Sequence, residues 1–588
     1  MADPTNSEIA AALDELGDLY ELDGAIIHRI VAYRNAAKAV RDAPVSVSAL
    51  ARQRRATELP GIGQTIQEKV LALADDGAIP AAVKLRAKFP PGLIEITQLP
   101  GLGPKRARRL FEELSIDSPQ SLREAAQTQR IRSLKGFGPK AEASILAALA
   151  AADADAGAEG PDHGRGGRRT VLNRALTVGE ELIAVLRAHP AAARVELAGS
   201  ARRMTDSVKD LDLIATAGDP GALARAAAEL DLVETAQTPG ESGVRLRTHT
   251  GLKVDLRIVA PDQFGNLLQH FTGSKEHNMA LRDAAVRKGL HVSEYGVLDD
   301  ATGETHKCAT EDEVYGLLGL QYIEPELREN RGELEAAAAG TLPALVELTD
   351  LRGDLHCHTT ASDGTASIEE MALSARQAGY EYLAITDHSA SFGFGDEVDP
   401  NRLREQIKRI RSLSVDGLQL LAGSEVNILP DGSLDYADDL LAELDWVVAS
   451  VHSSFRMSSD TMTARIVRAI EHPLVDAIGH LSGRKIERRR PYAFDLERVI
   501  EAAARTGTML EINASPDRRD MNDVQARAAA AAGIPIVISC DAHRVRGFEV
   551  ARYGIATARR AWLTAPEIAN TQPWAAVAAL RSRNREIG

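Results

Sequence analysis

The sequence predicts a multidomain protein with an all-α N-terminal region, a central α/β region and a C-terminal parallel α/β barrel or doubly wound sheet. Its 588 residues can form three or four domains of about 100 to 200 residues each. Residues 1–150 have helical patterning interrupted by repeated Gly-x-Gly turns, and the stretch from 170 to about 325 alternates helical and strand patterns. From residue 351 onward, apolar strand-like runs alternate with amphipathic helices, which is typical of a parallel sheet.

Composition marks the borders between these regions. Residues 151–169, AADADAGAEGPDHGRGGRR, are rich in Ala, Gly and Asp without periodicity, so we expect a flexible linker. A second connector runs from about residue 326 to 350. We therefore divide the chain into two helical domains, the linker, two central domains, the connector and a C-terminal domain: 1–80, 81–150, 151–169, 170–265, 266–325, 326–350 and 351–588.

Charge and cysteine content narrow the class of protein. The net charge of −15 argues against nucleic acid only as an average, because residues 1–150 carry 20 Lys and Arg against 18 Asp and Glu, a net +2 that leaves −17 elsewhere. A local basic stripe can still contact phosphates. Cys308, Cys357 and Cys540 have no framework spacing, which fits a reducing compartment. With no signal pattern and no run of about 18 apolar residues, we expect a cytoplasmic protein without membrane contact.

Three N-terminal segments share one pattern: LPGIGQTIQEKV from Leu59, LPGLGPKRARRL from Leu99 and LKGFGPKAEASI from Leu134. Each has a hydrophobic residue, a Gly-x-Gly turn and a helix, an arrangement that can hold a phosphate on backbone amides without reading a base. One copy would be an ordinary helix turn, but three copies favour DNA-binding helix-hairpin-helix modules. The candidate DNA-binding residues are Gly61, Gly63, Gly101, Gly103, Lys105, Gly136, Gly138 and Lys140.

The central region carries three candidate metal-binding carboxylates. In VELAGSARRMTDSVKDLDLIAT, a strand leads into Gly199-Ser200, and a second strand carries Asp210 and Asp212. Residues i and i+2 on a strand share a face. Asp255 lies on a later strand, GLKVDLRIVA. Three close carboxylates repel one another unless cations lie between them, and two Mg²⁺ ions there could activate a hydroxyl and stabilise a leaving pyrophosphate.

Two small-residue turns accompany these carboxylates. Gly199-Ser200, with Arg203, can offer amides and a positive charge to a triphosphate. HFTGSKEHNMALR forms the second turn, with Gly273, Ser274, Asn278 and Arg282. With these elements in this order, residues 1 to about 325 resemble a family X DNA polymerase, with an α/β nucleotidyltransferase palm (170–265) and a small thumb (266–325).

The resemblance implies a role for each matching residue. Asp210 and Asp212 would bind both metal ions, and Asp255 would bind the catalytic one and help to deprotonate the primer 3′-hydroxyl. Ser200 and Arg203 would hold the incoming triphosphate. Gly273 and Ser274 would line the sugar, and Asn278 would reach the minor-groove edge of the base, with Gly199 and Arg282 also at the nucleotide.

Two positions bear on further properties of such an enzyme. His270 stands where many family members have a tyrosine beside the nucleotide sugar, so discrimination between deoxyribose and ribose can differ. Lys69 matches the lysine with which some relatives excise a 5′-deoxyribose phosphate through a Schiff base, while Thr65 replaces a nearby lysine of those relatives. An ordinary helix-surface lysine is the alternative for Lys69.

In the last 240 or so residues, nine candidate metal ligands follow short apolar runs. They are His356, His358, Asp363, His388, Glu425, His452, His480, Asp541 and His543. A single buried His is usually a core residue, but nine such groups at equivalent strand ends indicate a cluster of divalent ions at the carboxyl face of a barrel. Imidazole and carboxylate ligands without thiolate favour Zn²⁺, Mn²⁺ or Fe²⁺.

The order of these ligands resembles the PHP (polymerase and histidinol phosphatase) family, whose domain is a distorted parallel α/β barrel. By that resemblance one ion would bind His356, His358, Glu425 and Asp541; a second would bind Asp363, His388 and His543; and a third would bind Glu425, His452 and His480. Arg484 and Lys485 are candidates to hold the substrate phosphate.

The resemblance implies a DNA polymerase that fills short gaps during base excision-type repair, with a PHP 3′-5′ exonuclease and, as a further option, cleavage at abasic sites. We expect two Mg²⁺ ions at the polymerase site, up to three Mn²⁺ or Zn²⁺ ions at the PHP site, gapped or primed DNA and dNTPs as substrates, and a monomer. One alternative is a small-molecule phosphatase with a vestigial polymerase module, and another is a non-catalytic DNA repair scaffold. Primer extension separates the first from a polymerase, and Asp210→Ala and His356→Ala variants test the second.

Overall fold

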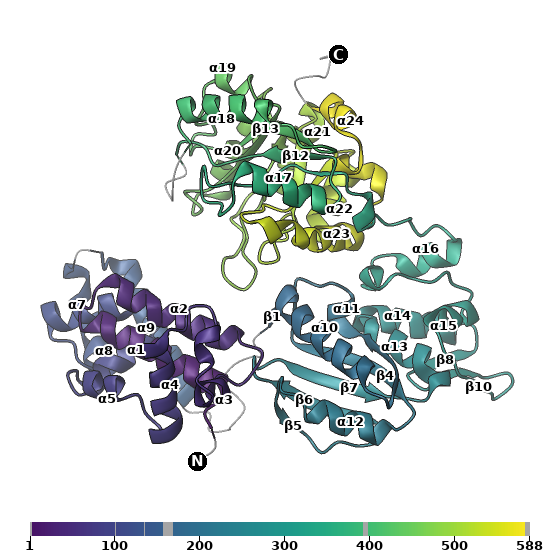
Figure 1. Ribbon diagram of the computed structural model, residues 1–588, viewed down its shortest axis with the longest axis horizontal. Helices are drawn as coiled ribbons and strands as arrows, with labels where there is room; N and C mark the ends of the chain where they lie inside the picture. The colour runs from purple at the N-terminus through teal and green to yellow at the C-terminus, as the bar shows by residue number, and fades with distance from the viewer. Residues whose placement is uncertain (1–2, 100–101, 135, 157–168, 392–397, 582–588) are drawn as a thin grey trace. The chain divides into compact units, whose positions relative to one another are not determined.

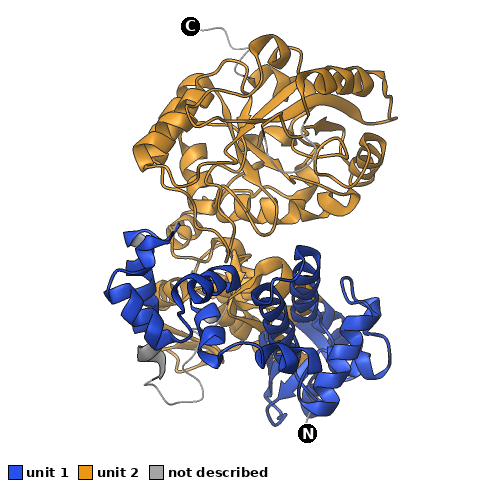
Figure 2. Cartoon of the chain, turned by 90° about the vertical axis from the view of Figure 1, so that its left-hand side faces the viewer, with its two compact units in different colours: residues 1–168, 181–195, 217–258 blue, residues 169–180, 196–216, 259–588 orange. Residues whose placement is uncertain are grey.

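Three kinds of structure follow one another along the chain: helices alone, then helices mixed with antiparallel strands, then a parallel barrel (Figure 1). The computed structural model describes residues 3–99, 102–134, 136–156, 169–391 and 398–581. By internal contacts the chain divides into two compact units, residues 1–168, 181–195 and 217–258, and residues 169–180, 196–216 and 259–588 (Figure 2).

The N-terminal region is all-α, as predicted, over the described part of residues 3–156. Its helices are α1 (Asn6–Leu22), α2 (Ile27–Asp42), α3 (Val47–Arg52), α4 (Gln64–Asp76), α5 (Pro80–Arg86), α6 (Pro91–Gln98), α7 (Pro104–Leu114), α8 (Pro119–Gln127) and α9 (Pro139–Ala156). Two apolar cores hold them together. One is built around Leu13 and Val40, and the other around Leu110 and Phe137.

The three Gly-x-Gly segments share one backbone hydrogen bond among their described residues. In each, the amide between the two glycines donates to the carbonyl of the leucine three residues earlier: Ile62 to Leu59 at 3.1 Å, Leu102 to Leu99 at 3.0 Å and Phe137 to Leu134 at 3.0 Å. The first glycine is left-handed at Gly61 (φ +86°) and Gly136 (φ +92°), where a side chain would be strained. Gly101 lies outside the described residues, as do residues 157–168 of the expected linker.

The middle of the chain mixes helices and strands. The first unit contains an antiparallel ladder of β5 (Val233–Ala236), β6 (Gly243–Thr248) and β7 (Lys253–Ile258) with helix α12 (Pro220–Ala228). Helix α10 (Leu172–Ala188) and strand β2 (Ala192–Leu197) precede them. The second unit contains helix α11 (Gly199–Arg202) and strands β3 (Ser207–Val208) and β4 (Asp210–Ala217). Every second residue of β6 and β7 is buried, as expected for strands with one covered face.

The predicted thumb region contains helices around a small sheet. Strands β8 (Leu290–Ser293), β9 (Gly296–Asp299) and β10 (Thr305–His306) form an antiparallel sheet in the order β10-β9-β8. Its helices are α13 (Phe264–Thr272), α14 (Lys275–Val286), α15 (Glu311–Leu317) and α16 (Glu333–Ala339). Buried Tyr315 and Val314 of α15 anchor the core of this region.

In its described residues, 353–391 and 398–581, the C-terminal domain is a parallel barrel of seven strands. They are β11 (Gly353–Asp354), β12 (Tyr382–Ile385), β13 (Gln419–Asn427), β14 (Trp446–Ser450), β15 (Ala477–Ile478), β16 (Met509–Asn513) and β17 (Ile536–Ser539). Each pairs with the next in chain order, and a parallel bridge between Cys357 and Ala542 joins the first strand to the last. Because the strand order never reverses, the predicted barrel is confirmed and the doubly wound alternative is wrong.

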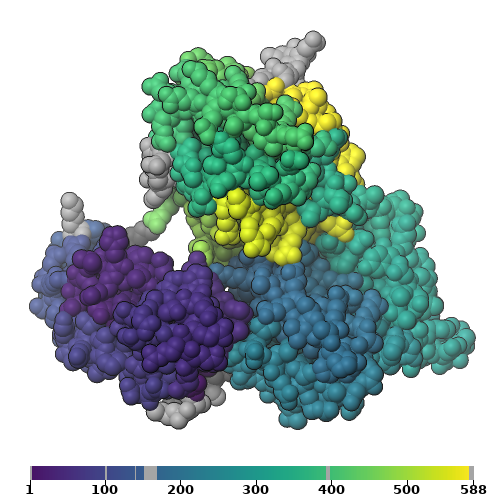
Figure 3. All heavy atoms as spheres, in the orientation of Figure 1, coloured from purple at the N-terminus to yellow at the C-terminus, as the bar shows by residue number. Residues whose placement is uncertain are grey.

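Helices cover the outside of this barrel (Figure 1). They are α17 (Ile368–Gln377), α18 (Pro400–Ser412), α19 (Asp438–Leu441), α20 (Ser459–Ile470), α21 (Leu496–Thr506), α22 (Asp523–Ala531), α23 (Ala551–Arg560) and α24 (Trp574–Leu580). Strands β12, β14, β16 and β17 are buried along their whole length, as a parallel sheet under helices requires. In the space-filling view the domain, green to yellow, forms one continuous mass (Figure 3).

Every helix in the described part of the chain is too short or too polar to cross a lipid bilayer.

Candidate metal centres and nucleotide site

The nine predicted metal ligands all lie at one end of the barrel. His356 and His358 follow β11, His388 follows β12, Glu425 is on β13, His452 and His480 follow β14 and β15, and Asp541 and His543 follow β17. Asp363 lies in the loop after His358. Since parallel strands present their carboxyl ends at one face, residues nearly 190 positions apart converge there.

Glu425 lies at the middle of this cluster, with its side chain 1% exposed. Its Oε2 is 2.9 Å from Nδ1 of His388 and 3.4 Å from Nε2 of His356. Its Oε1 is 2.9 Å from Nε2 of His480 and 3.2 Å from Nε2 of His452. The carboxylate therefore faces imidazoles from four strand ends at once, a position from which it can bridge ions.

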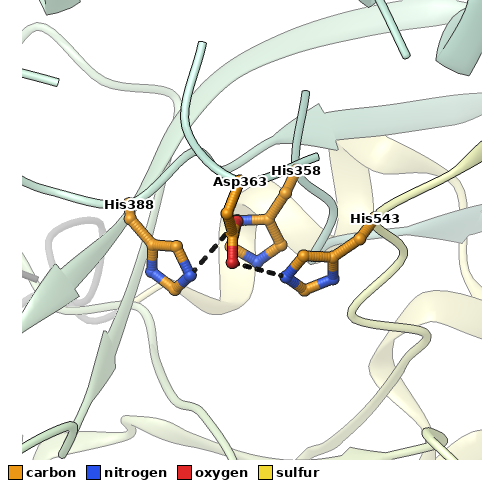
Figure 4. Close-up of side chains that lie close together, drawn as sticks. All are labelled: His358, Asp363, His388 and His543. Atoms are coloured by element: carbon orange, nitrogen blue, oxygen red, sulfur yellow. Dashed lines mark ion pairs between the residues drawn. The ribbon is translucent and has the colours of Figure 1, made fainter. Parts of the chain in front are cut away.

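Asp363 forms a second focus (Figure 4). Its Oδ2 is 3.3 Å from Nε2 of His543, and its Oδ1 is 3.5 Å from Nε2 of His388 and 3.8 Å from Nδ1 of His358. The opposite ring nitrogen of His358, Nε2, is 3.2 Å from Oδ1 of Asp541. His358 thus stands between two carboxylates.

Three groups of these side chains have ligand atoms within 4.8 Å of one another, close enough to share an ion: His358, Asp363, His388 and His543; His356, His358 and Asp541; and His388, Glu425 and His452. All eight residues belong to the nine predicted ligands, and the ninth, His480, contacts Glu425. His358 and His388 each occur in two groups. The assignment of each ligand to one ion stays a prediction.

The donor set fits divalent cations. Buried atoms of the cluster lack a hydrogen-bond partner of good geometry among the described residues: Nε2 of His356, both ring nitrogens of His358, both carboxylate oxygens of Glu425 and Nδ1 of His480. Buried polar atoms without partners are costly. Bound cations would be coordinated by the Glu425 oxygens and by one lone pair of each neutral imidazole, ligands suited to Zn²⁺, Mn²⁺ or Fe²⁺.

Protonation differs between the ligands of the cluster. Burial opposes ionisation of Glu425, but His452, His356 and His388 outweigh it and hold the pKa of Glu425 well below its usual value. Burial, with His388 and His543, lowers the pKa of His358 to about 4, and burial, with Arg518, lowers that of His480 to about 3. Burial opposes protonation of His356 and His388, but neighbouring carboxylates outweigh it, raising the pKa of His356 well above its usual value and that of His388 to about 9. A cation that binds these two rings would therefore displace protons.

Two further residues, neither predicted from the sequence, orient the ligands. Oε1 of Glu511 is 2.6 Å from Nδ1 of His356, and its Oε2 accepts a 2.7 Å hydrogen bond from the amide of His480. Oδ1 of Asn427 is 2.6 Å from Nδ1 of His452. Such partners fix the ring orientation of a ligating histidine. For Asn427 the sequence did carry a signal. It lies two residues after Glu425 on β13, and residues two apart on a strand share a face.

The cluster opens into a pocket of about 330 Å³. Besides the ligands, its walls contain Lys485, Ser515 and Arg518. Lys485 pairs with Asp517 at 3.3 Å, and Nε of Arg518 is 3.6 Å from Oδ2 of Asp541. Two cationic side chains in the wall of a carboxylate-rich pocket are suited to a phosphate group. Lys485 and Arg518 both line the pocket, and their binding of phosphate stays a prediction.

Arg484, the other candidate for holding phosphate, does not line this pocket. Its Nη1 pairs with Oδ2 of Asp206 at 2.7 Å and its Nε donates to the carbonyl of Arg518 at 2.8 Å. The guanidinium therefore contacts the loop that precedes β3 and β4. That Arg484 binds the substrate phosphate stays a prediction.

The predicted nucleotide site begins at Gly199. Asp210 and Asp212 lie on one half-buried face of β4, while Leu211 and Leu213 are fully buried on the other. Gly199 has φ +65°, and a Cβ there would lie 2.1 Å from Oδ2 of Asp212. The amide of Ala198 donates to the carbonyl of Asp212 at 2.8 Å. Only glycine permits this approach of the turn to the Asp212 carboxylate.

Asp255, the third predicted carboxylate, lies on β7 in the other unit. Its side chain pairs with Nε of Arg257 at 3.1 Å and with Nε of Arg245 on β6 at 3.5 Å. These arginines balance the charge of the carboxylate. That Asp255 joins Asp210 and Asp212 around two ions stays a prediction.

Ser200 lies in α11, and Arg203 directly follows that helix. Ser200 is half-buried in α11. Nε of Arg203 pairs with Oε1 of Glu329 at 3.0 Å, and its Nη1 donates to the carbonyl of Thr272 at 2.8 Å. The second contact ties Arg203 to the residue before Gly273. The two predicted nucleotide-binding turns therefore meet through one guanidinium.

The second turn is built by side chains that cap α14. Oγ of Ser274 accepts from the amide of His277 at 3.0 Å. Nδ2 of Asn278 donates to the carbonyl of His270 at 2.6 Å, and Nη2 of Arg282 lies 3.3 Å from Nδ1 of His270. A Cβ on Gly273 would lie 2.4 Å from Oδ1 of Asn278. His270, Gly273, Asn278 and Arg282 are thus brought together as the sequence suggested.

In the helical region, the second glycines Gly63 and Gly103 cap α4 and α7, and Gly138 precedes α9. Lys105 is exposed on α7, while the side chain of Lys140 lies outside the described residues. Nζ of Lys69 lies 6.0 Å from the ring centre of Tyr33. An aromatic neighbour shields one side of this lysine.

Family models match most of the chain. A helix-hairpin-helix domain matches residues 4–79 and a SAM-like helix-hairpin-helix tandem matches 93–151. The DNA polymerase beta thumb matches residues 267–329, and the PHP domain matches 354–515. Together with the barrel and its ligand cluster, these matches define a family X DNA polymerase fused to a PHP domain.

One relative extends the match over nearly the whole chain. The DNA polymerase/3′-5′ exonuclease PolX of Bacillus subtilis is 35% identical over 581 residues, covering 98% of this chain and 99% of that protein. The chain belongs to the PolX family. Proteins named as probable phosphatases, from Thermoanaerobacter sp. and Shewanella oneidensis, are 31% and 33% identical over 256 and 200 residues. They cover 40% and 32% of this chain, so the likeness to phosphatases concerns a minor part of it.

Proposed function

We propose that this protein is a DNA polymerase that fills short gaps during base excision-type repair and trims 3′ ends with its PHP domain. The observation that carries the proposal is end-to-end similarity to a DNA polymerase/3′-5′ exonuclease, combined with a converged ligand cluster in the barrel. The small-molecule phosphatase alternative is disfavoured, because the phosphatase relatives lack a counterpart to most of the chain. Cleavage at abasic sites is a further activity of the same pocket.

At the nucleotide site, Asp210, Asp212 and Asp255 would hold two Mg²⁺ ions. When bound, such ions activate the attacking oxygen and neutralise charge on the phosphates. Gly199 and Ser200 present the turn amides and Arg203 a guanidinium to the dNTP triphosphate. Gly273 and Ser274 line the sugar and Asn278 reaches the base, with Arg282 and His270 beside them.

At the PHP site, the nine ligands would hold up to three Mn²⁺ or Zn²⁺ ions. When bound, these ions supply a nucleophile at neutral pH and polarise the phosphodiester. Glu511 and Asn427 keep His356 and His452 oriented, while Lys485 and Arg518 bind the substrate phosphate. The helix-hairpin-helix turns, with Lys105, Lys140 and the paired glycines, bind the DNA backbone. We propose a monomer, because one chain supplies both ligand sets.

The test is a gapped duplex incubated with Mg²⁺ or Mn²⁺, with and without dNTPs, for the wild type, Asp255→Ala and His358→Ala. We expect loss of synthesis in the first variant alone and loss of degradation in the second alone. Lack of primer extension by the wild type would favour the phosphatase. Wild-type behaviour of Asp210→Ala and His356→Ala in both assays would favour the scaffold. Loss of both reactions from one substitution in a folded protein would contradict two separate sites.

A further inference from the structure

The loop of residues 203–206 joins the two halves of the predicted nucleotide site within the second unit. It follows α11, which contains Gly199 and Ser200, and it precedes β3 and β4, which lead to Asp210 and Asp212. Met204 has φ +56°, a left-handed conformation that is unfavourable for a residue with a long side chain. A loop held in such a conformation depends on contacts from its surroundings.

Three arginines of the barrel domain supply those contacts. Nη1 of Arg560 donates to the carbonyl of Arg203 at 2.9 Å. Nη1 of Arg519 donates to the carbonyl of Met204 at 2.9 Å, and Arg484 pairs with Asp206. Two carbonyl groups and one carboxylate of the loop therefore contact guanidinium groups. These lie 278 to 357 residues later in the sequence.

These guanidinium groups are themselves fixed. The side chain of Arg519 is 1% exposed, and its Nε donates to Oγ1 of Thr557 at 3.0 Å. Nη2 of Arg560 pairs with Oδ2 of Asp523 at 3.1 Å, and its side chain is 10% exposed. Burial lowers the pKa of Arg519 to about 10, so the group stays cationic at neutral pH. Rigid, buried donors can hold a loop in one shape.

Glu329 connects Arg560 to the predicted triphosphate-binding residue. Its Oε1 lies 2.8 Å from Nη1 of Arg560 and 3.0 Å from Nε of Arg203. One carboxylate is thus shared between two guanidinium groups. Without Arg560, the whole charge of Glu329 would act on Arg203 and compete with a triphosphate for it.

We propose that Arg560 and Arg519 of the barrel domain are positioning residues for nucleotide addition, which they support by holding the 203–206 loop and leaving Arg203 able to bind the triphosphate. The inference rests on the proposed polymerase function. It assigns the PHP domain a part in the polymerase reaction that is separate from its own metal cluster. Neither arginine contacts a substrate in this role, since each acts through the loop.

Arg559 provides a matched control on the same helix. It precedes Arg560 on α23, its side chain is 16% exposed, and its Nε pairs with Oε1 of Glu326 at 2.7 Å. Like Arg560, it ties the barrel domain to the segment after the thumb. Unlike Arg560, it contacts Glu324, Glu326 and Val346, which lie outside the 203–206 loop.

The experiment measures KM for dNTP and kcat on a gapped duplex with Mg²⁺, for full-length wild type, Arg560→Met, Arg519→Met and Arg559→Met. We expect Arg560→Met and Arg519→Met to raise KM about tenfold or more with a smaller fall in kcat, and Arg559→Met to change KM less than about twofold. Exonuclease activity without dNTPs and the melting temperature, measured on the same preparations, report whether the barrel is folded. Arg560→Lys, which keeps the charge but has fewer fixed donors, should have an intermediate KM and serves if Arg560→Met does not fold.

A double-substitution cycle tests the route of the effect. If Arg560 acts through Arg203, Arg560→Met should add less than about twofold to the KM of an Arg203→Met variant. The proposal is overturned if Arg560→Met and Arg519→Met raise KM no more than Arg559→Met, or if the Arg560 and Arg203 effects multiply. A wild type that extends no primer would instead refute the polymerase function itself.

Discussion

Nδ1 of His356 lies 2.6 Å from Oε1 of Glu511, and both side chains are buried at the end of the barrel. The same glutamate receives the amide of His480 on its other oxygen. One carboxylate that is not itself a predicted ligand therefore orients the strand ends that present two ligands. With the first nitrogen of His356 engaged, its Nε2 is left facing Glu425 and Asp541.

Replacing Glu511 should weaken metal binding without touching a ligand. We expect Glu511→Gln to lower the apparent affinity for Mn²⁺ by roughly 10 to 100-fold, because the orienting partner of a ligating histidine contributes about that much. Titration of exonuclease activity and of binding heat with Mn²⁺ measures it. Glu497→Gln, on the exposed face of α21, is the control, and equal Mn²⁺ dependence of the two variants would contradict the role of Glu511.

A second prediction follows from how closely the Gly199 backbone lies to the Asp212 carboxylate. Gly199→Ala would place a Cβ 2.1 Å from Oδ2 of Asp212 at a left-handed φ of +65°, so the turn and the carboxylate must move apart. We expect primer extension to fall about tenfold or more, with exonuclease activity unchanged. Gly218→Ala, which would meet no atom within 4 Å, should extend primers normally. Unimpaired extension by Gly199→Ala would show that this contact is not needed.

The lowered pKa of Glu311 predicts how the free energy of unfolding depends on pH. Burial opposes its ionisation, but Arg328 and Arg202 outweigh burial and lower its pKa to about 2. The pKa of Glu311 is depressed in the folded state, so its ionised carboxylate contributes fully to the free energy of unfolding above the unfolded pKa of about 4.3. This contribution is lost as pH falls from there toward 2. It amounts to about 3 kcal/mol.

Thermal unfolding of the wild type and Glu311→Gln between pH 6 and pH 2.5 checks this contribution. The variant should be less stable at pH 6, because it leaves the buried Arg328 guanidinium uncompensated. The difference between the two proteins should shrink toward pH 2.5. A difference that stays constant over this range would mean that Glu311 is not ionised in the folded protein.

Much of the ligand cluster was predictable because strand periodicity and barrel geometry act together. His356, His388 and His452 each follow an apolar run, and a parallel barrel brings the ends of such runs to one face. The relation of Asp210 to Asp212 follows in the same way from the two-residue repeat of a strand. Local pattern therefore fixes these positions without knowledge of distant contacts.

Contacts between distant segments were not predictable. Nothing in the letters around Arg484 separates it from Lys485, yet the first pairs with Asp206 and the second lines the metal pocket. Glu511 and Arg519 likewise acquire partners only through tertiary packing, 155 and 315 residues away. Side-chain direction on a loop depends on backbone conformation, such as the left-handed φ of Arg519, for which a single sequence carries little signal.

The last prediction concerns Arg518 in the wall of the pocket. Arg518 lines the cavity beside the cluster and lies 3.6 Å from Asp541, so it can neutralise a phosphate as the substrate enters. We expect Arg518→Met to raise the KM of the exonuclease for single-stranded DNA about tenfold. The slope of log KM against log salt concentration should fall by about 0.7, the value for one phosphate contact on a single strand. Arg498→Met, at an exposed position of α21, should change neither quantity. If Arg518→Met lowers kcat while KM and the salt slope stay at wild-type values, Arg518 supports the metal ligands rather than binding the DNA.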